Sequence, residues 1–192
     1  MAYAQVQICN IAIGMVGGRR IIDINQQDST EAMLLKEMWD LCVEDTLAGR
    51  DWSFARTIIP VSAVIDPLSL DRKCYQVPPD ALTVRRLGTD PTCKNDMFWE
   101  IQNGVIVVES EVAYVRYTHK IYDLSKFDAP FVSALCARLA YELALPVANN
   151  RSLWEAMLTL AASRLDEGAA INGIQGKRES FTPGLLSKAR NR

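Results

Sequence analysis

The residues of this chain that could do acid–base chemistry are one histidine and three close pairs of carboxylates. The pairs are Glu44 with Asp45, Asp166 with Glu167, and Glu109 with Glu111. A glycosidase needs two well-placed acids, and a histidine can act as the base for a serine or cysteine nucleophile. No G-x-S-x-G elbow accompanies His119, so we expect it to be a partly exposed residue at a strand end. Neighbouring carboxylates are usually solvated, and a cell-wall hydrolase acting through paired carboxylates is therefore kept only as the alternative function.

The sequence offers no motif for a metal or a phosphate. Five cysteines stand far apart, at positions 9, 42, 74, 93 and 136, without a CxxC pair. Gly173, Gly176 and Lys177 resemble part of a phosphate loop, but Ile171 replaces its first glycine and Arg178 replaces the Ser or Thr that holds magnesium. We predict no catalytic residues, no cofactor and no metal. The scattered cysteines predict buried, reduced thiols in a protein made in a reducing cytoplasm.

Composition predicts a folded chain with an uneven charge distribution. Its 192 residues are 49% hydrophobic and 23% charged, which suits one large or two small globular domains. The net charge is −2, yet the stretch from Gly168 onward holds five basic residues and one acid. We expect an acidic body with a basic tail, and no general attraction to nucleic acid or membranes. The apolar stretch near the N-terminus follows no basic region, and no apolar stretch is long enough to cross a membrane, so we expect no signal peptide and no membrane span.

Helical periodicity marks both ends of the chain. Residues 6–16 predict a helix that ends at Gly17, and Asp28 with Glu31 predicts a capping box for a second helix that ends at Gly49. Asp128 predicts the start of a third, very apolar helix that Pro146 terminates. A fourth helix is expected to begin with a capping box formed by Ser152 and Glu155 and to end near Gly168.

Between the helices the periodicity changes to that of strands. The expected strands are 57–64, 74–77, 82–87, 97–102, 105–109 and 112–118. Pro60 places the first of them at an edge or a bulge. Asn103-Gly104 is the preferred type I′ hairpin turn and sets Ile101 opposite Ile106, on a face predicted to be apolar.

These elements predict the α+β class, because the strands are grouped instead of alternating with helices. The simplest architecture is an antiparallel helical bundle built from both ends of the chain, with a small antiparallel β domain inserted and an extended C-terminal tail. The expected parts are 1–56 and 125–172 for the bundle, 57–124 for the β domain, and 173–192 for the tail. Trp39, Trp52, Phe54 and Trp154 are expected in the core.

Several short motifs, in order, resemble the tail tubular protein A family, the head-to-tail adaptors of short-tailed phages related to T7. Asn10-Ile11-Ala12-Ile13-Gly14 followed by Ile21 is similar to the family's opening motif, and Trp52-Ser53-Phe54-Ala55 to its W-x-F-A. Tyr75-Gln76-Val77-Pro78 with Asp80 resembles Y-x-L-P-x-D. Tyr114-Val115-Arg116-Tyr117 resembles the closing strand of the family. Residues 127–145 resemble the helix that follows that strand. The similarity covers most of residues 6–168 and does not extend past about Gly173.

The resemblance implies a structural protein of the virion, made in the host cytoplasm and located at the head–tail junction. Such adaptors form a dodecameric ring below the portal protein, connect it to the tail nozzle protein, and surround the channel through which genomic DNA passes without specific binding. A related neck or tail-completion protein is a further alternative. We expect the free chain to be mainly monomeric.

Two sets of candidate contact residues follow from this resemblance. The apolar third helix is expected to pack against adjacent subunits through Phe131, Leu135, Leu139 and Leu143. The tail, by its position, is the candidate arm for docking on the portal. Its candidate residues are Lys177, Arg178, Phe181, Leu185, Leu186, Lys188 and Arg190.

Overall fold

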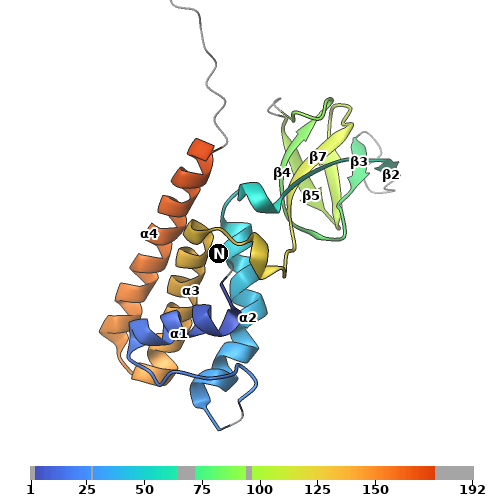
Figure 1. Cartoon of the computed structure of the whole chain (residues 1–192). Helices are drawn as coiled ribbons and strands as arrows, with labels where there is room; N and C mark the ends of the chain where they lie inside the picture. The colour runs from blue at the N-terminus through green and yellow to red at the C-terminus, as the bar shows by residue number, and fades with distance from the viewer. Residues whose placement is uncertain (1–2, 27, 65–71, 94–96, 176–192) are drawn as a thin grey trace, which may run out of the picture.

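A computed structural model describes residues 3–26, 28–64, 72–93 and 97–175 of the chain. The described residues form four α-helices and two antiparallel sheets, which confirms the predicted α+β class. Figure 1 shows a helical part and a strand part side by side. The helices are α1 (Gln5–Val16), α2 (Thr30–Gly49), α3 (Ala129–Ala148) and α4 (Arg151–Gln175). Two short 3-10 helices, Ser53–Ala55 and Leu124–Lys126, lie where the chain passes between the two parts.

The strand part contains seven strands among the described residues. One sheet has the order β1-β7-β4 and the other the order β2-β3-β6-β5. The strands are β1 (Arg56–Pro60), β2 (Ala63–Val64), β3 (Lys73–Gln76), β4 (Ala81–Gly88), β5 (Trp99–Gln102), β6 (Val105–Val108) and β7 (Tyr114–His119). All pairings are antiparallel, as expected when strands are grouped along the chain.

The hairpin between β5 and β6 is confirmed. Asn103 and Gly104 have φ of 48° and 78°, the left-handed values that a type I′ turn requires, and Ile101 lies opposite Ile106. The pairs Ile101–Ile106 and Trp99–Val108 form the apolar face that was predicted. Ile106 is fully buried whereas Ile101 is 51% exposed, because β5 is the edge strand of its sheet.

The single strand expected over 57–64 is also wrong, because the chain changes sheets there. β1 ends at Pro60, which has no N–H to donate to a ladder. The next amide, that of Val61, donates to the carbonyl of Ala113 at 2.9 Å. The chain then enters β2 in the other sheet, so Pro60 marks the crossing between the sheets.

In the helical part, α3 packs against α1, α2 and α4, while α1 lies across the other helices (Figure 1). Phe131, Leu135, Leu139 and Leu143 of α3 are all fully buried within this single chain. The interpretation of these four side chains as contacts to adjacent subunits is therefore wrong: the chain's own helices already cover them. By length and composition α3 is apolar enough to cross a membrane, but here it is the core helix of the helical part.

The start of α2 differs from the prediction by one residue. Ser29, not Asp28, is the N-cap, and its Oγ accepts the amide N–H of Ala32 at 3.3 Å. The carboxylate of Glu31 accepts the amide N–H of Arg19 at 2.9 Å, and this bond lowers the pKa of Glu31 below its ordinary value. Glu31 thus fastens the loop between α1 and α2 to the start of α2.

The boundary between α3 and α4 also differs. Pro146 does not terminate α3, which continues to Ala148 and closes at Asn149 in the left-handed conformation. Pro146 has no N–H for the carbonyl of Glu142, and the helix continues for only two residues beyond it. The cap of α4 is not Ser152: the side-chain oxygen of Asn150 accepts the amide N–H of Leu153 at 3.0 Å.

Gly168 does not end α4, which continues to Gln175. A Cβ built on Gly168 would lie 2.7 Å from Cη2 of Trp52, so the glycine allows the indole ring to lie against the helix backbone. Trp52 is fully buried and donates its indole N–H to the carbonyl of Thr46 at 2.9 Å. The glycine therefore positions α4 against the linker that leads into the strand part.

Gly168→Ala is expected to lower the free energy of unfolding by about 0–2 kcal/mol. Overpacking against a fully buried ring costs about 1–3 kcal/mol, and the gain in helix propensity offsets about 1 kcal/mol of that. Gly14→Ala is the matched control, because Gly14 is also helical and a Cβ there would have nothing within 4 Å. The control should gain about 0.5–1 kcal/mol in urea unfolding. Equal shifts in both variants would contradict the close approach.

The buried apolar side chains form two clusters, one in each part. The larger contains buried side chains of α1, α2 and α3 together with Trp52, and partly buried side chains of α4 and Leu82 of β4 pack against it. The smaller lies between the two sheets around Ile106 and Val115. The two parts therefore have separate cores, and Leu82 together with polar contacts connects them.

Candidate functional site

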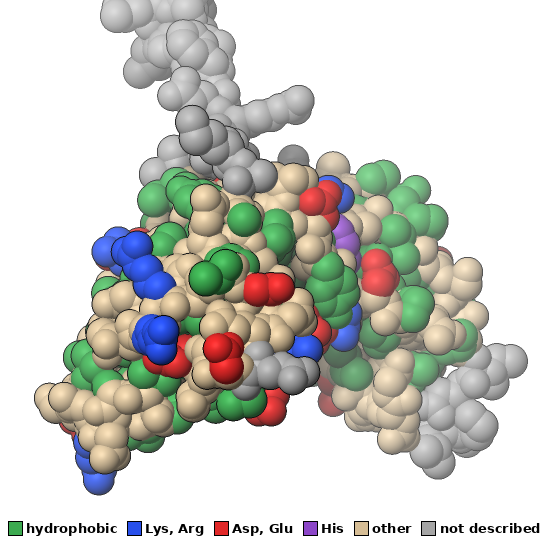
Figure 2. All heavy atoms as spheres, turned by 60° about the horizontal axis from the view of Figure 1, so that its bottom comes forward, with side chains coloured by type: hydrophobic (Ala, Val, Ile, Leu, Met, Phe, Trp, Pro, Cys, Tyr) green, Lys and Arg blue, Asp and Glu red, His purple; other side chains and the backbone are tan. Residues whose placement is uncertain are grey.

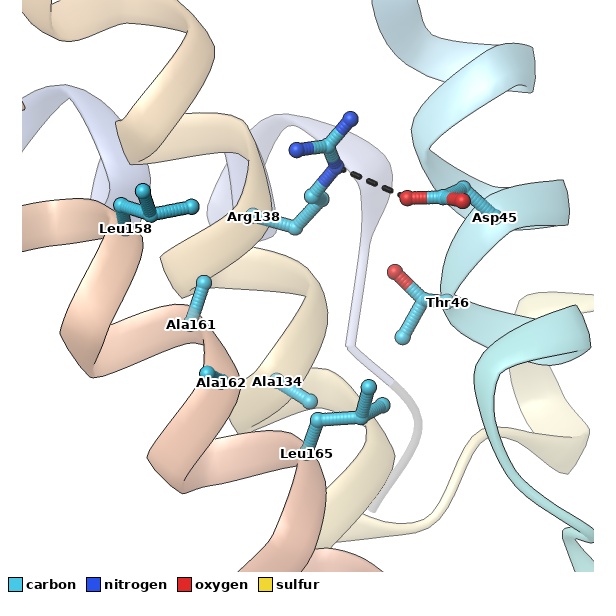
Figure 3. Close-up of a pocket in the computed structure, with 8 residues that line it drawn as sticks. All are labelled: Asp45, Thr46, Ala134, Arg138, Leu158, Ala161, Ala162 and Leu165. Atoms are coloured by element: carbon cyan, nitrogen blue, oxygen red, sulfur yellow. Dashed lines mark ion pairs between the residues drawn. The ribbon is translucent and has the colours of Figure 1, made fainter.

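A groove on the helical part lies between α2, α3 and α4 (Figure 3). It encloses about 190 Å³. Its lining residues are Asp45 and Thr46 from α2, Ala134 and Arg138 from α3, and Leu158, Ala161, Ala162 and Leu165 from α4. The helix sequences create this hollow, because alanines stand where larger side chains would fill the space between α3 and α4.

At one end the groove is closed where α2 meets α4. A Cβ built on Gly49 would lie 3.0 Å from Leu165, and Arg50 forms an ion pair with Asp166. Away from this end α3 lies between the two helices, as Figure 1 shows, and forms the floor of the groove. The hollow is therefore bounded by the ends of α2 and α4 and opens toward their earlier turns.

Arg138 is the charged centre of the groove. Its Nη2 lies 2.8 Å from Glu142, its guanidinium lies 5.0 Å from the Tyr141 ring centroid, and its Nε lies 3.0 Å from Asp45. The Nε–H does not point at the Asp45 carboxylate in hydrogen-bond geometry, so that contact is an ion pair only. Arg138 and Asp45 are thus the charged side chains that line the groove, and Glu142, which does not line it, pairs with the same guanidinium.

Most of the charged side chains on α2 are acidic. This helix carries five acidic residues and one lysine, all exposed or half-buried. They are Glu31, Lys36, Glu37, Asp40, Glu44 and Asp45. Figure 2 shows one face of the molecule, on which charged side chains interrupt the apolar ones over the helical part. Glu31 and Glu44 already accept from the amide of Arg19 and from Lys120, so the attraction of a basic partner to α2 rests on Glu37, Asp40 and Asp45.

The end of α4 is fastened to the linker between the parts. Asn172 is 5% exposed; its Oδ1 accepts the amide N–H of Ser53 at 3.0 Å, and its Nδ2 donates to the carbonyl of Asp51 at 2.8 Å. Residues 173–192 were predicted to follow the last helix, but α4 extends into that range, to Gln175. The last described turns of the chain are therefore held at a fixed place beside Trp52.

Arg85 of β4 joins the strand part to the end of α2. Its Nη2 lies 2.6 Å from the carbonyl of Ala48, 2.8 Å from that of Arg50 and 3.3 Å from that of Leu47, and its Nε donates to Thr118 Oγ1 at 2.9 Å. The three carbonyls belong to the end of a helix, which carries partial negative charge. Burial lowers the pKa of Arg85 below its ordinary value.

Ionic contacts of Asp51 also connect the strand part to the residues that follow α2. Asp51 lies between Arg116 of β7 and Arg56 of β1, and forms ion pairs with both. We call the contacts of Arg85, Asp51, Arg116 and Asn172 the joint. Together they fix the strand part, the linker and the end of α4 relative to one another.

The candidate portal-binding residues lie outside the described residues, so their prediction stays untested. They are Lys177, Arg178, Phe181, Leu185, Leu186, Lys188 and Arg190. The groove and the joint were not predicted. No local pattern indicates them, because each brings together residues that are far apart in the sequence, such as Ser53 and Asn172.

His119 is confirmed as a half-buried residue at the end of β7. Its Nδ1 lies 2.8 Å from the carbonyl of Ala55 and 2.8 Å from the hydroxyl of Thr57. Because a carbonyl can only accept, Nδ1 carries the proton and cannot take one from Thr57. This hydroxyl–imidazole pair is therefore not arranged as a nucleophile with its base.

Five of the six carboxylates singled out as candidate acids are engaged in ion pairs. Glu44 accepts from Lys120 and from the hydroxyl of Tyr122, both at 2.9 Å, and these bonds lower the pKa of Glu44. The bond from Lys73 likewise lowers the pKa of Glu111. Asp45, Asp166 and Glu167 pair with Arg138, Arg50 and Arg164. A glycosidase acid instead needs a raised pKa.

All five cysteines are buried and free, as the sequence predicted. Burial raises the pKa of Cys9, Cys42 and Cys136 to about 12, so these thiols are protonated and unreactive at neutral pH. Within the described ranges, no three His, Cys, Asp or Glu side chains come together as a set of metal ligands.

Comparison with known proteins assigns no family to the chain: no protein-family model matches it, and no curated protein matches it. The support for a function therefore comes from the groove, the joint and the ordered motifs of the sequence.

Proposed function

We propose that this chain is a structural head-to-tail adaptor that resembles tail tubular protein A. It forms a ring below the portal of a short-tailed phage, connects the portal to the tail nozzle, and encloses part of the channel through which DNA leaves. Its architecture in this proposal is a helical bundle built from both ends of the chain, with the β domain inserted. The ordered motifs along residues 6–168 support this reading.

One observation carries the proposal: the motif residues coincide with the core and the joint. In the motif resembling W-x-F-A, Trp52 and Ala55 are fully buried beside the joint. Tyr75, from the motif resembling Y-x-L-P-x-D, is 5% exposed, and its hydroxyl accepts the amide N–H of Val112 at 2.9 Å. The first motif thus lies beside the joint and the second in the core of the strand part. A ring needs the geometry that such contacts fix to repeat identically in each subunit.

The surface for neighbouring subunits must differ from the buried stripe of α3. Large apolar side chains are exposed in both parts, and those of Phe98, Ile22 and Ile101 are between 51% and 92% exposed. In Figure 2 apolar side chains gather at the right, over the strand part. We assign subunit contacts to this exposed set, because side chains of this kind are typical of the centres of protein interfaces.

The basic tail is assigned to portal docking. The joint holds the end of α4, so residues 176–192 begin from a fixed point of each subunit. These residues include five basic side chains and one acidic one. A segment of this composition can gain affinity by ordering on an acidic and apolar partner surface.

Co-sedimentation with the purified portal ring tests the proposal. The full chain should co-sediment, and a chain ending at Gln175 should not. A full-length chain carrying Phe181→Ser, Leu185→Ser and Leu186→Ser is the matched control for length and charge, and it should bind weakly. If no form binds the portal, the adaptor function is wrong. If the shortened chain binds as well as the full chain, the adaptor function stands and the tail is not the docking arm.

A further inference from the structure

The groove between α2, α3 and α4 leaves apolar surface without a partner among the described residues. Leu158 is 45% exposed on the α4 wall, and Leu41, one helical turn before Asp45 on α2, is 65% exposed. Ala161 and Ala162 leave room between these walls. The groove can therefore accept a few large apolar side chains from an extended segment, of the kind that helical grooves take up.

The C-terminal segment, residues 176–192, can reach this groove from the end of its own α4. At 1.5 Å per residue, Leu165 lies about 15 Å and Leu158 about 26 Å back from Gln175 along the helix. An extended chain spans about 3.3 Å per residue, so Phe181 reaches about 20 Å from Gln175, and Leu185 about 33 Å. The spacing of these apolar residues thus matches the spacing of the two leucines in the groove wall.

Charge also favours this segment. The segment has five basic residues and one acid, whereas α2, which forms the other wall, carries Glu37, Asp40 and Asp45 against one lysine. The other two acids of α2 already accept from the amide of Arg19 and from Lys120. Within the groove, Arg138 already faces both Asp45 and Glu142. Lys188 and Arg190, which follow Leu186, would lie beyond the apolar contacts, where α2 presents Glu37 and Asp40.

We propose that the groove is the docking site of the chain's own residues 176–192, which place Phe181, Leu185 and Leu186 against α4 and their basic residues along α2. Covalent attachment gives the segment a local concentration in the millimolar range, which favours it over the segment of another copy. The inference does not depend on the adaptor function. If both hold, the portal must displace the segment from the groove, and a blocked groove should strengthen portal binding.

Trypsin cleavage after Lys188 in the full chain tests the docking directly, without any portal. The cleavage rate is compared with that of a synthetic peptide of residues 176–192, and mass spectrometry follows the products. We expect cleavage in the chain to be about tenfold slower, which corresponds to docking by about 1.4 kcal/mol. Ala162→Gln, which fills the groove, should bring the rate to that of the peptide. Ala156→Gln, on an exposed part of α4 outside the groove, should keep the protection.

Each other outcome would overturn the proposal. Equal rates in the wild-type chain and the peptide mean that the segment does not dock. Protection that survives Ala162→Gln places the segment elsewhere. Protection that increases with chain concentration means that a second copy supplies the groove. Replacement of Phe181, Leu185 and Leu186 by serine leaves the described part unchanged and must also remove protection, when measured against a peptide with the same replacements.

Discussion

Trp52→Ala is expected to lower the free energy of unfolding by about 3–5 kcal/mol, the largest effect of any substitution considered. The indole is fully buried, packs edge-to-face on Phe131 with centroids 5.2 Å apart, and lies against the backbone at Gly168. Alanine would leave a cavity where α3, α4 and the linker meet. Urea unfolding followed by circular dichroism measures the change.

Trp52→Phe is the matched variant, because it keeps an aromatic ring and removes the indole N–H. The carbonyl of Thr46 then loses its bond from Trp52, which costs about 1–3 kcal/mol. Phenylalanine should therefore be less destabilising than alanine. A loss below about 1 kcal/mol in Trp52→Ala, near the average for any substitution, would show that Trp52 does not hold the linker.

Arg85→Met is expected to lower the free energy of unfolding by about 2–3 kcal/mol and to uncouple the two parts. The substitution keeps an apolar stem but removes the donors for the carbonyls of Ala48 and Arg50, and hydrogen bonds from a charged group are worth about 1.5–3 kcal/mol. Because the two cores are separate, calorimetry should show one transition in the wild-type chain and two in the variant.

The neighbouring residue supplies the control for this prediction. Arg86 follows Arg85 on β4 and its side chain is exposed, so Arg86→Met should change stability by less than about 0.5 kcal/mol and leave a single transition. Two transitions in the wild-type chain, or none added by Arg85→Met, would contradict the role assigned to the joint.

Structural features that depend on neighbouring residues could be predicted from local signals in the sequence. The Asn103-Gly104 hairpin follows from the backbone preferences of two residues, and its register was correct. The N-caps of α2 and α4 were predicted wrongly because each helix start has more than one residue that can serve as an N-cap. Asp28 and Ser29 are adjacent, and only the path of the preceding loop, held by Glu31, decides between them.

Features that depend on distant partners could not be predicted. Gly168 has the sequence context of a helix end, and only the position of Trp52 shows that it is a close packing contact. Arg85 and Asn172 have nothing nearby that indicates their partners 33 to 121 residues away. The leucine stripe of α3 correctly predicted a covered helix, but periodicity does not tell whether the same chain or another subunit provides the cover.

The helices that form the helical core lie on both sides of the strand part in the sequence, and this order matters during synthesis on the ribosome. α1 and α2 emerge first, but α3, which covers them, begins about 80 residues after α2 ends. At 5–20 residues per second this delay is roughly 4–16 s. The strand part is contiguous in the chain and can fold during that interval, whereas the apolar faces of α1 and α2 stay uncovered. The nascent N-terminal helices are therefore the stretch of this protein that most needs a holding chaperone.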